Sequence, residues 1–245
     1  MVEYLVEGVV RAVKLLITMD PYVISVAKVQ VLVSTSAVLL ASATAVPLAV
    51  LFCFRSFPLK NFLLTLINTG MGLPPVVVGL VVFVIFMRRG PLGFLDLIYT
   101  REIMVVAQFL LAFPIILGVS IAAINAVPES IRETAYTLGA RDREVALLVV
   151  REAAFGIITG ILAGAGRVFA EVGAILTVGG NIAYDMVTPE GIIQVSKTRT
   201  LSTAIPLETS QGDIAAAIAF GLILLAITFI LNLLVSVLRR RAGVA

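Results

Sequence analysis

Two ionisable residues, Arg167 and Glu171, stand four positions apart inside an apolar run of this 245-residue chain. Residues four apart share one face of a helix, and an ionisable group at membrane depth is expected to face a bundle interior or a water-filled path. The guanidinium could therefore lie beside a path for an anion, with the carboxylate tuning its charge. The alternative is a permanent salt bridge that locks helices together, because pairing is how proteins usually accommodate buried charges.

Two further segments could line such a path, and their residues are Asn68, Thr69, Pro74, Pro75, Gly179, Gly180 and Asn181. In the first segment the two prolines break a helix, and backbone N–H groups freed there could approach an anion. The alternative is a kink that only lets helices pack. The second segment could form an outer gate, although glycine after a helical run is also typical of a plain helix end.

The composition argues against an enzyme or a metalloprotein. The chain has no histidine and one cysteine, Cys53, so zinc, haem and iron–sulfur sites are not expected. It has no G-x-x-x-x-G-K-[ST] phosphate-binding loop, so any ATP hydrolysis has to come from a partner chain that holds ATP and Mg²⁺. The net charge of +3 does not indicate nucleic acid, since basic residues of membrane proteins concentrate in cytoplasmic loops. We expect no catalytic residue, no metal and no directly bound cofactor.

The elements that position these residues are predicted to be transmembrane helices. Hydrophobic residues make up 60% of the chain and charged residues 13%, whereas soluble domains carry about 25% charged residues. Several apolar runs exceed the roughly 18 residues that indicate a span, and their continuity favours helices over barrel strands. The expected fold class is an all-α polytopic membrane protein with one transmembrane domain over residues 1–245. Five spans are predicted, at about 23–54, 62–87, 103–126, 153–178 and 214–238.

The ends and loops predict an orientation. Residues 1–20 have an apolar and a charged face at helical spacing, which predicts a helix lying on the membrane surface. Five spans place the termini on opposite sides, and the basic stretch 239–241 favours a cytoplasmic C-terminus. The N-terminus and the loop 179–213 then fall outside, and the segment 128–152 falls in the cytoplasm.

The segment 128–152, PESIRETAYTLGARDREVALLVVRE, is a polar island in an otherwise apolar chain. Ser130 and Glu133 have capping-box spacing, which predicts a helix over about 131–138 that Gly139 ends. Asp142 is placed to cap a second helix. A helix this short is marginal alone in water and would be stabilised by packing on a partner or on the protein's own spans. The alternative is a plain connecting loop, although long loops with their own caps are often functional.

This island resembles the cytoplasmic "EAA" loop of ABC importer permeases. Glu133, Ala135 and Gly139 have the spacing E-x-A-x-x-x-G, and Thr134 replaces the first alanine of the motif. In that family the loop forms a coupling helix that docks into a groove on the ATP-hydrolysing subunit. The resemblance implies ATPase-coupling roles for Ile131, Glu133, Ala135, Tyr136, Leu138, Gly139 and Ala140.

Three more stretches are similar to permeases for oxyanions, the tungstate-type branch first and molybdate and sulfate permeases next. They are INTGMGLPPVVVGL (67–80), GRVFAEVGAILTVGGNI (166–182) and TLSTAIPLETSQGD (200–213), while the stretch 183–198 looks longer than the corresponding loop of that branch. The resemblance implies a type I-like permease fold in a prokaryotic cell membrane. It also implies a homodimer of permeases, two ATP-binding cassette subunits and an external substrate-binding protein.

The residues leave two rival classes open. A secondary transporter working without ATP fits the broken helices, but five spans make an inverted repeat within one chain awkward. An intramembrane enzyme would need a paired catalytic set, and Glu171 is the only acid deep in a predicted span. The resemblance, by contrast, implies an ATP-driven importer of tungstate or molybdate that works by alternating access, with sulfate or another anion as the alternative cargo.

Overall fold

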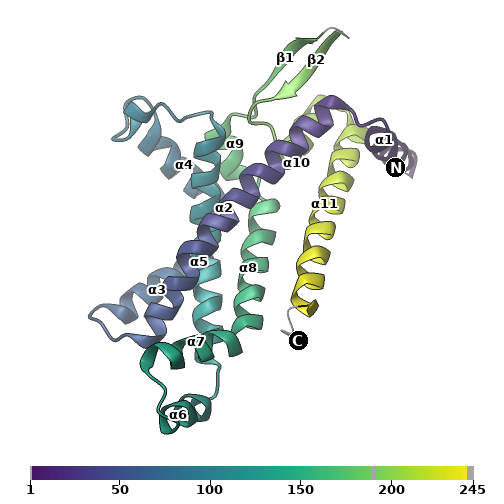
Figure 1. Ribbon diagram of the computed structural model, residues 1–245. Coiled ribbons are helices and arrows are strands. Elements are labelled where there is room, and N and C mark those ends of the chain that lie inside the picture. The colour runs from purple at the N-terminus through teal and green to yellow at the C-terminus, as the bar shows by residue number, and fades with distance from the viewer. Residues whose placement is uncertain (1, 189–190, 242–245) are drawn as a thin grey trace. The chain divides into compact units, whose positions relative to one another are not determined.

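The fold is mainly helical, with one small β-hairpin (Figure 1). The computed structural model describes residues 2–188 and 191–241. In chain order the elements are α1 (Val2–Ile17), α2 (Pro21–Phe54), α3 (Lys60–Met71), α4 (Pro75–Phe86), the 3₁₀ turn η1 (Gly93–Leu95), α5 (Arg101–Asn125), α6 (Glu129–Thr137), α7 (Asp142–Glu152), α8 (Ala154–Phe169), α9 (Gly173–Gly179), β1 (Ala183–Thr188), β2 (Gly191–Ser196), α10 (Leu201–Gln211) and α11 (Ile214–Arg241). The expected helical membrane fold is confirmed, and the hairpin is the departure from an all-α chain.

Three helices are long and apolar enough to cross a membrane by themselves: α2, α5, and α11 over Ile214–Leu233. Two bent pairs, α3 with α4 and α7 with α8, pass the same test together. The described residues therefore contain three candidate spans, or up to five if each bent pair is one span. The predicted first, third and fifth spans are continuous helices, and the second and fourth are interrupted.

The second predicted span is interrupted between α3 and α4, as the sequence predicts. Pro74 and Pro75 lack the N–H that a continuing helix needs, so α4 begins with Pro75 at its first position, where no donor is required. The N–H groups of Gly72 and Leu73 turn back onto the carbonyls of Thr69 and Gly70. These two backbone donors are therefore paired inside the protein rather than left free for an anion.

The fourth predicted span was expected to be one helix from about 153 to 178, and this is wrong. Helix α8 ends at Phe169, and a short helix, α9, begins at Gly173. The carboxylate of Glu171 accepts the N–H of Ala174 at 3.0 Å, which satisfies an early donor of α9. The sequence shows no interruption here because the residues on both sides of the break are equally apolar.

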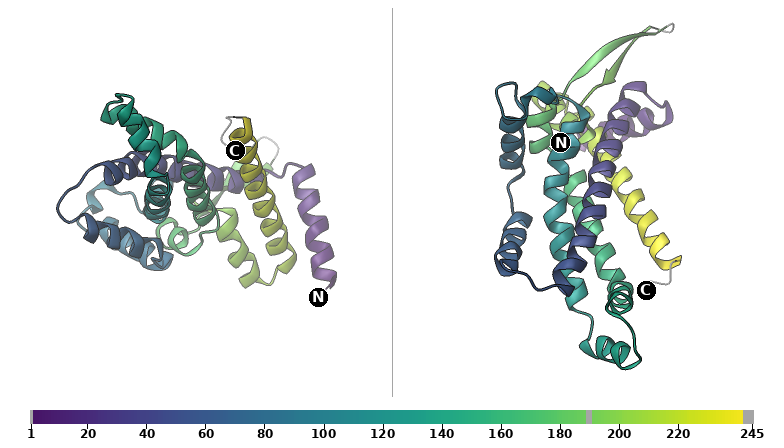
Figure 2. Two further views of the ribbon diagram at one scale, coloured as in Figure 1. Left: turned by 90° about the horizontal axis from the view of Figure 1, so that it is seen from below. Right: turned by 60° about the vertical axis from the view of Figure 1, so that its left-hand side comes forward.

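The segment 179–213 contains ordered elements. β1 and β2 pair antiparallel, with a register that runs from Ala183 opposite Ser196 to Thr188 opposite Gly191. Helix α10 follows, and the hydroxyl of Thr200 accepts the N–H of Thr203 to cap its first turn. Figures 1 and 2 show the hairpin extending away from the helices to which its ends are joined.

Contacts divide the chain into two compact units. The first comprises residues 1–37, 74–108 and 168–232, and the second comprises 38–73, 109–167 and 233–245. Helices α2, α5, α8 and α11 each contribute to both units.

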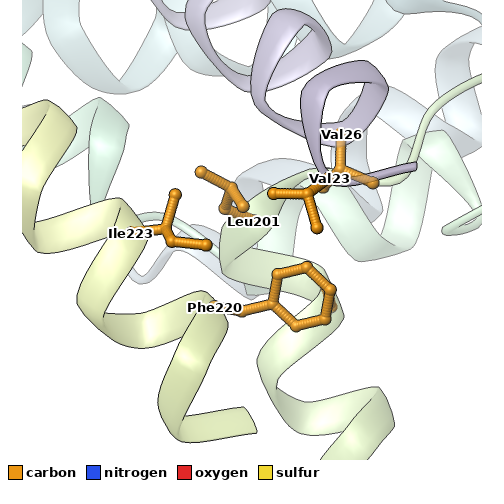
Figure 3. Close-up of a cluster of buried hydrophobic side chains, with 6 residues drawn as sticks. Val23, Val26, Leu201, Phe220 and Ile223 are labelled. Carbon is orange, nitrogen blue, oxygen red and sulfur yellow. The ribbon is translucent and has the colours of Figure 1, made fainter. Parts of the chain in front are cut away.

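The first unit has a core where α2, α10 and α11 meet (Figure 3). Val23 and Val26 of α2 pack with Leu201 of α10 and with Phe220 and Ile223 of α11, and all five are almost completely buried. The ring of Tyr22 meets that of Phe220 edge to face, with the ring centroids 6.1 Å apart. This core holds the start of α2 against α10 and α11.

In the second unit, α8 packs closely on α5 through glycines four residues apart. A Cβ at Gly156 would overlap the side chain of Ala123. One at Gly160 would lie 3.0 Å from Val119, and one at Gly164 would lie 2.6 Å from Ile116. Small residues at this spacing let two helix backbones approach in a membrane. These three glycines therefore form the α5–α8 contact, whereas a Cβ at Gly166 would meet nothing within 4 Å.

The predicted surface helix forms as α1 and packs on the start of α11 (Figure 2, left). A Cβ at Gly8 would lie 2.5 Å from the side chain of Ile218, so the glycine permits the contact. Arg11 Nη1 lies 2.8 Å and 2.9 Å from the two carboxylate oxygens of Asp213. Exposed valines such as Val6 and Val10 lie on the remaining surface of α1. That α1 lies on the membrane surface stays a prediction.

Candidate functional sites

The polar segment 128–152 folds into two short helices, α6 and α7 (Figure 1). Helix α6 begins at Glu129, directly after Pro128, and no side chain caps its first turn. The predicted capping box of Ser130 and Glu133 is therefore wrong, because proline starts the helix earlier and places both residues inside it. The predicted cap by Asp142 is also wrong: this residue is the first of α7, and the carboxylate of Glu144 instead accepts the N–H of Arg141 at 2.7 Å.

Gly139 joins the two helices in the left-handed conformation that the sequence predicts for it. Its φ is +85°, a backbone region that side-chain-bearing residues rarely adopt. The turn is closed by hydrogen bonds from the N–H groups of Gly139 and Ala140 to the carbonyls of Tyr136 and Ala135. This glycine fixes the direction in which the chain leaves α6.

The surface of α6 is partly apolar and open. Leu138 is 83% exposed and Tyr136 is 48% exposed, whereas Ala135 is buried. A shallow groove of about 400 Å³ is lined by Ser130, Ile131, Thr134, Ala135, Leu138, Ala140 and Leu148. Five of the seven predicted coupling residues, Ile131, Ala135, Tyr136, Leu138 and Ala140, thus lie in this groove or expose an apolar side chain beside it. Glu133 and Gly139 are exposed on the same segment.

Arg132 attaches α6 to the helix ends of its own unit, a role the sequence analysis missed. Its guanidinium lies 5.2 Å from the centre of the Phe54 ring at the end of α2. Its Nη2 donates to the carbonyl of Ile124, near the end of α5, at 3.2 Å. Its Nη1 lies 3.6 Å from the carboxylate of Glu129. One side chain therefore connects the exposed helix to the last turns of two long apolar helices.

Asp142 is the hydrogen-bond partner of Tyr136, the aromatic residue of the segment 128–152. The hydroxyl of Tyr136 donates to its carboxylate at 3.3 Å. Desolvation and the negative charge of this carboxylate raise the pKa of the Tyr136 phenol above its ordinary value. Tyr136 therefore stays a neutral hydrogen-bond donor at physiological pH.

Around the α3–α4 break, internal hydrogen bonds are made by the side chains of Thr69 and Arg167. Asn68 and Thr69 lie exposed on α3, and the Thr69 hydroxyl donates to the carbonyl of Thr65 at 2.9 Å. Arg167 Nη2 donates to the carbonyl of Leu73, within the break, at 3.3 Å. Arg167 thus satisfies a carbonyl that the interrupted helix leaves without an N–H partner.

Glu171 does not share a helix face with Arg167, because α8 ends at Phe169. The predicted i,i+4 arrangement is therefore wrong. Glu171 is buried, its carboxylate accepts the N–H of Ala174, and its backbone carbonyl accepts the hydroxyl of Ser202 at 2.8 Å. These contacts support the start of α9 and join it to α10.

Gly179, Gly180 and Asn181 form the end of α9. Gly180 has φ +69° and donates its N–H to the carbonyl of Leu176, so the helix-end interpretation describes its geometry. The Asn181 side chain accepts the hydroxyl of Thr203 at 2.9 Å and joins this end to α10. Whether the three residues also act as a gate stays a prediction.

Glycines bring α4 and α9 into close contact within the first unit. A Cβ at Gly79 would lie 2.7 Å from Ala174 Cα, and one at Gly173 would lie 2.6 Å from Val76. The helices that follow the two breaks, α4 after residues 72–74 and α9 after residues 170–172, therefore pack backbone to backbone.

A buried polar cluster on α2 and α5 was missed by the sequence analysis. Gln30, Ser34 and Gln108 are fully buried. The Gln108 and Gln30 amides donate to the carbonyls of Val168 and Phe169 at 3.3 Å and 3.5 Å, respectively. They satisfy the last carbonyls of the interrupted helix α8, which is required where water is excluded. The signal was present, because each glutamine is a large polar residue inside a long, mainly apolar run.

A helical membrane chain with interrupted helices and an exposed two-helix polar connection has the architecture of a transport permease. The chain belongs to the family described as "Binding-protein-dependent transport system inner membrane component", which matches residues 37–244. The sequence resemblance to ABC permeases is thereby confirmed.

Two relatives cover nearly the whole chain. A probable anion ABC transporter permease protein of Haloferax volcanii is 44% identical over 213 residues, which are 87% of this chain and 89% of that protein. The tungstate uptake system permease protein TupB of Peptoclostridium acidaminophilum is 36% identical over 230 residues, which are 94% and 96% of the two chains. A sulfate transport system permease protein of Synechocystis is 23% identical over 196 residues, 77% of this chain and 67% of that protein.

Solved structures confirm the fold. A chain of a bacterial alginate ABC transporter, crystallised with a periplasmic protein that binds an alginate pentasaccharide, aligns with a TM-score of 0.66 and 16% identity over 89% of this chain and 78% of that chain. A chain of an amino acid ABC transporter aligns with a TM-score of 0.63 and 16% identity over 92% and 96% of the two chains. The predicted ABC permease fold is therefore correct.

Proposed function

We propose that this chain is the membrane subunit of an ATP-driven importer of an oxyanion, tungstate or molybdate. The observation that carries the proposal is the α6 segment, in which an apolar side chain, Leu138, is 83% exposed at the end of a two-turn helix that Arg132 holds against two long helices. A short helix of this kind is stabilised by a partner surface. The names of the anion and tungstate relatives support the cargo.

The partner that covers α6 is an ATP-binding cassette subunit, which supplies ATP and Mg²⁺ while the permease itself carries out no hydrolysis. Two such subunits act on a homodimer of this chain, and an external binding protein delivers the anion. Closure of the ATPase subunits displaces α6, and Arg132 transmits the displacement to the ends of α2 and α5. The spans then reorient and open the path to the opposite side of the membrane.

The proposed orientation places α6 and the C-terminus in the cytoplasm and the N-terminus and hairpin outside. Asn68, Thr69, Arg167, Glu171 and the α9 end at Gly179–Asn181 remain the candidates for residues along the path. Arg167 and Glu171 act there through the carbonyl and the helix start that they hold, rather than as a pair.

The coupling role is tested with Glu133→Lys in a complex reconstituted into liposomes with its ATPase and binding protein. We expect uptake to fall at least about tenfold, since reversing a charge in an interface introduces like-charge repulsion worth several kcal/mol. Glu152→Lys, at another exposed acid on α7, is the matched control and should transport normally. Uptake at the wild-type rate with a tightly coupled ATPase in Glu133→Lys would remove the coupling assignment.

The cargo is tested separately by titrating the external binding protein with tungstate, molybdate and sulfate and by measuring uptake of each anion. Preference for tungstate or molybdate is the expected result. Preference for sulfate would keep the importer and change its substrate, and co-purification without any ATPase chain would contradict the ATP-driven mechanism.

A further inference from the structure

A groove runs along one face of α2 in the first unit, away from the segments discussed above. It has a volume of about 830 Å³, which lies within the 300–1,000 Å³ range typical of ligand pockets. Residues at helical spacing form its wall on α2, namely Pro21, Ile24, Lys28 and Leu32. Arg101 at the start of α5 and Val195 in β2 also line it.

Lys28 is the distinctive residue of this wall. It is exposed and has no hydrogen-bond or ion-pair partner among residues 2–188 and 191–241. An unpaired lysine in an apolar helix is costly in hydrocarbon, unless its flexible stem carries the ammonium to the membrane surface or to an anion. The side chains that line the same face on either side, Ile24 and Leu32, are apolar.

Arg101 supplies a second positive charge. Its Nε and Nη2 donate to the carbonyls of Lys197 and Ser196 at 2.8 Å and 3.1 Å, which fixes the guanidinium beside the base of the hairpin. Among the described residues, no aspartate or glutamate lines the groove. The charge at this site is therefore positive and uncompensated, while most of the wall is apolar.

The depth of Lys28 matches the boundary between hydrocarbon and headgroups. The 34 residues of α2 form a helix about 50 Å long, and the hydrocarbon core of a bilayer is about 30 Å thick, so a centred helix extends about 10 Å beyond the core at each end. Lys28 follows Pro21 by seven residues, a rise of about 10 Å. Arg101 is the first residue of another membrane-length helix. With both helices centred in this way, Lys28 and Arg101 fall at the level of the lipid phosphates.

From this combination we infer that the groove binds an anionic phospholipid. Its headgroup is held by Lys28 and Arg101, and an acyl chain lies along Ile24 and Leu32. Charge complementarity selects an anionic lipid over a zwitterionic one, and the apolar wall selects a lipid over a free phosphate. The site is independent of the transport mechanism and of the anion carried.

The inference is tested by native mass spectrometry of the full chain released from detergent, with phosphatidylglycerol or phosphatidylcholine titrated in. We expect retention of phosphatidylglycerol in preference to phosphatidylcholine. Lys28→Gln should weaken phosphatidylglycerol binding about fivefold, because one basic residue near an anionic headgroup contributes about that factor. Lys28→Arg should restore binding. Arg89→Gln removes the same charge outside the groove and is the matched control.

Three outcomes would overturn the inference. The first is equal retention of both lipids by the wild-type chain, and the second is unchanged phosphatidylglycerol binding in Lys28→Gln. The third is a disulfide between two copies carrying Val31→Cys in a Cys53→Ala background, because this would show that a second copy covers the groove. Thermal unfolding of each variant confirms that it is folded. Weaker retention of phosphatidylglycerol by Leu32→Asn, which adds no charge, isolates the apolar contribution.

Discussion

At the scale of single residues, Arg132 links the exposed α6 to the helix ends behind it. Its contacts with Phe54, Ile124 and Glu129 involve one aromatic ring, one carbonyl and one carboxylate. Its Nε is buried and has no partner among the described residues, so the guanidinium is held by the geometry around it rather than by full hydrogen bonding.

We expect Arg132→Ala to uncouple ATP hydrolysis from uptake, reducing uptake at least about tenfold, because a hydrogen bond from a charged group contributes about 1.5–3 kcal/mol. The measurement is the number of anions imported per ATP hydrolysed in liposomes. Arg132→Lys should recover only part of the ratio, since an ammonium cannot reproduce the planar contacts of a guanidinium. Arg143→Ala, at an exposed arginine of α7, should leave the ratio unchanged; an unchanged ratio in Arg132→Ala would contradict the role.

Residue chemistry was only partly readable from the sequence. Gly139 was predictable because a glycine after a short amphipathic run is a local signal, and its φ of +85° agrees. The partners of Arg132 and Arg167 were not, because Phe54 and Leu73 are far from them in the chain. The buried glutamines Gln30 and Gln108 carried a signal that is interpretable only once α8 is known to end at Phe169.

At the scale of elements, the contact between α5 and α8 depends on small residues at one spacing. Gly164 faces Ile116, and Gly166 faces open space on the same helix. Alanine substitutions at these two glycines therefore distinguish the effect of helix packing on stability from the effect of backbone conformational freedom.

Gly164→Ala is expected to destabilise the chain by about 1–3 kcal/mol through overpacking against Ile116. Gly166→Ala should be neutral or stabilise it by about 0.5–1 kcal/mol, because alanine favours a helix over glycine. Chemical unfolding in detergent, monitored by circular dichroism, compares the two. Equal effects would show that α5 and α8 do not pack as described.

The attachment of α1 to α11 should depend on pH through Asp213. A hydrogen bond from the N–H of Ala216 lowers the pKa of this carboxyl, with a further contribution from Arg11. A lowered folded-state pKa means that the stabilisation is complete above the ordinary value of about 3.9 and is lost as the pH falls through the lowered value. Asp213→Asn removes this dependence. The difference in unfolding temperature between wild type and Asp213→Asn should therefore be constant from pH 7 to 5 and shrink below pH 4; a difference that grows on acidification would have the wrong sign.

Element prediction succeeded where apolar character was continuous and failed where it concealed a break. The runs that became α2, α5 and α11 needed only length and composition. The end of α8 depends on contacts of Glu171 and Ser202 that join separate parts of the chain. The sequence analysis noted the length of the stretch 183–198 and did not predict a hairpin there. Each strand has six residues, which is too few for a clear alternating pattern.

At the scale of the whole molecule, the proposed coupling of α6 to an ATPase requires that α6 lie in the cytoplasm. In a Cys53→Ala background, Thr137→Cys on α6 should react with a membrane-impermeant thiol reagent only from the cytoplasmic side. Gln194→Cys in the hairpin should react only from outside. The side chains of Thr137 and Gln194 are both exposed, so labelling of the introduced thiols reports the side of the membrane rather than burial. Labelling of both from one side would contradict the odd number of crossings.

The two ends of the β1–β2 hairpin are hydrogen-bonded to each other, so the residues between them can be replaced. The carbonyl of Ile182 accepts N–H groups from Lys197, Thr198 and Arg199 at 3.1–3.2 Å, so the chain returns to its starting point before α10 begins. A peptide epitope or a hairpin of different length spliced between Tyr184 and Gln194 would leave those closing bonds, and the helices they join, in place. Transporters of this design can thus change what protrudes from one face without altering the machinery inside the bilayer.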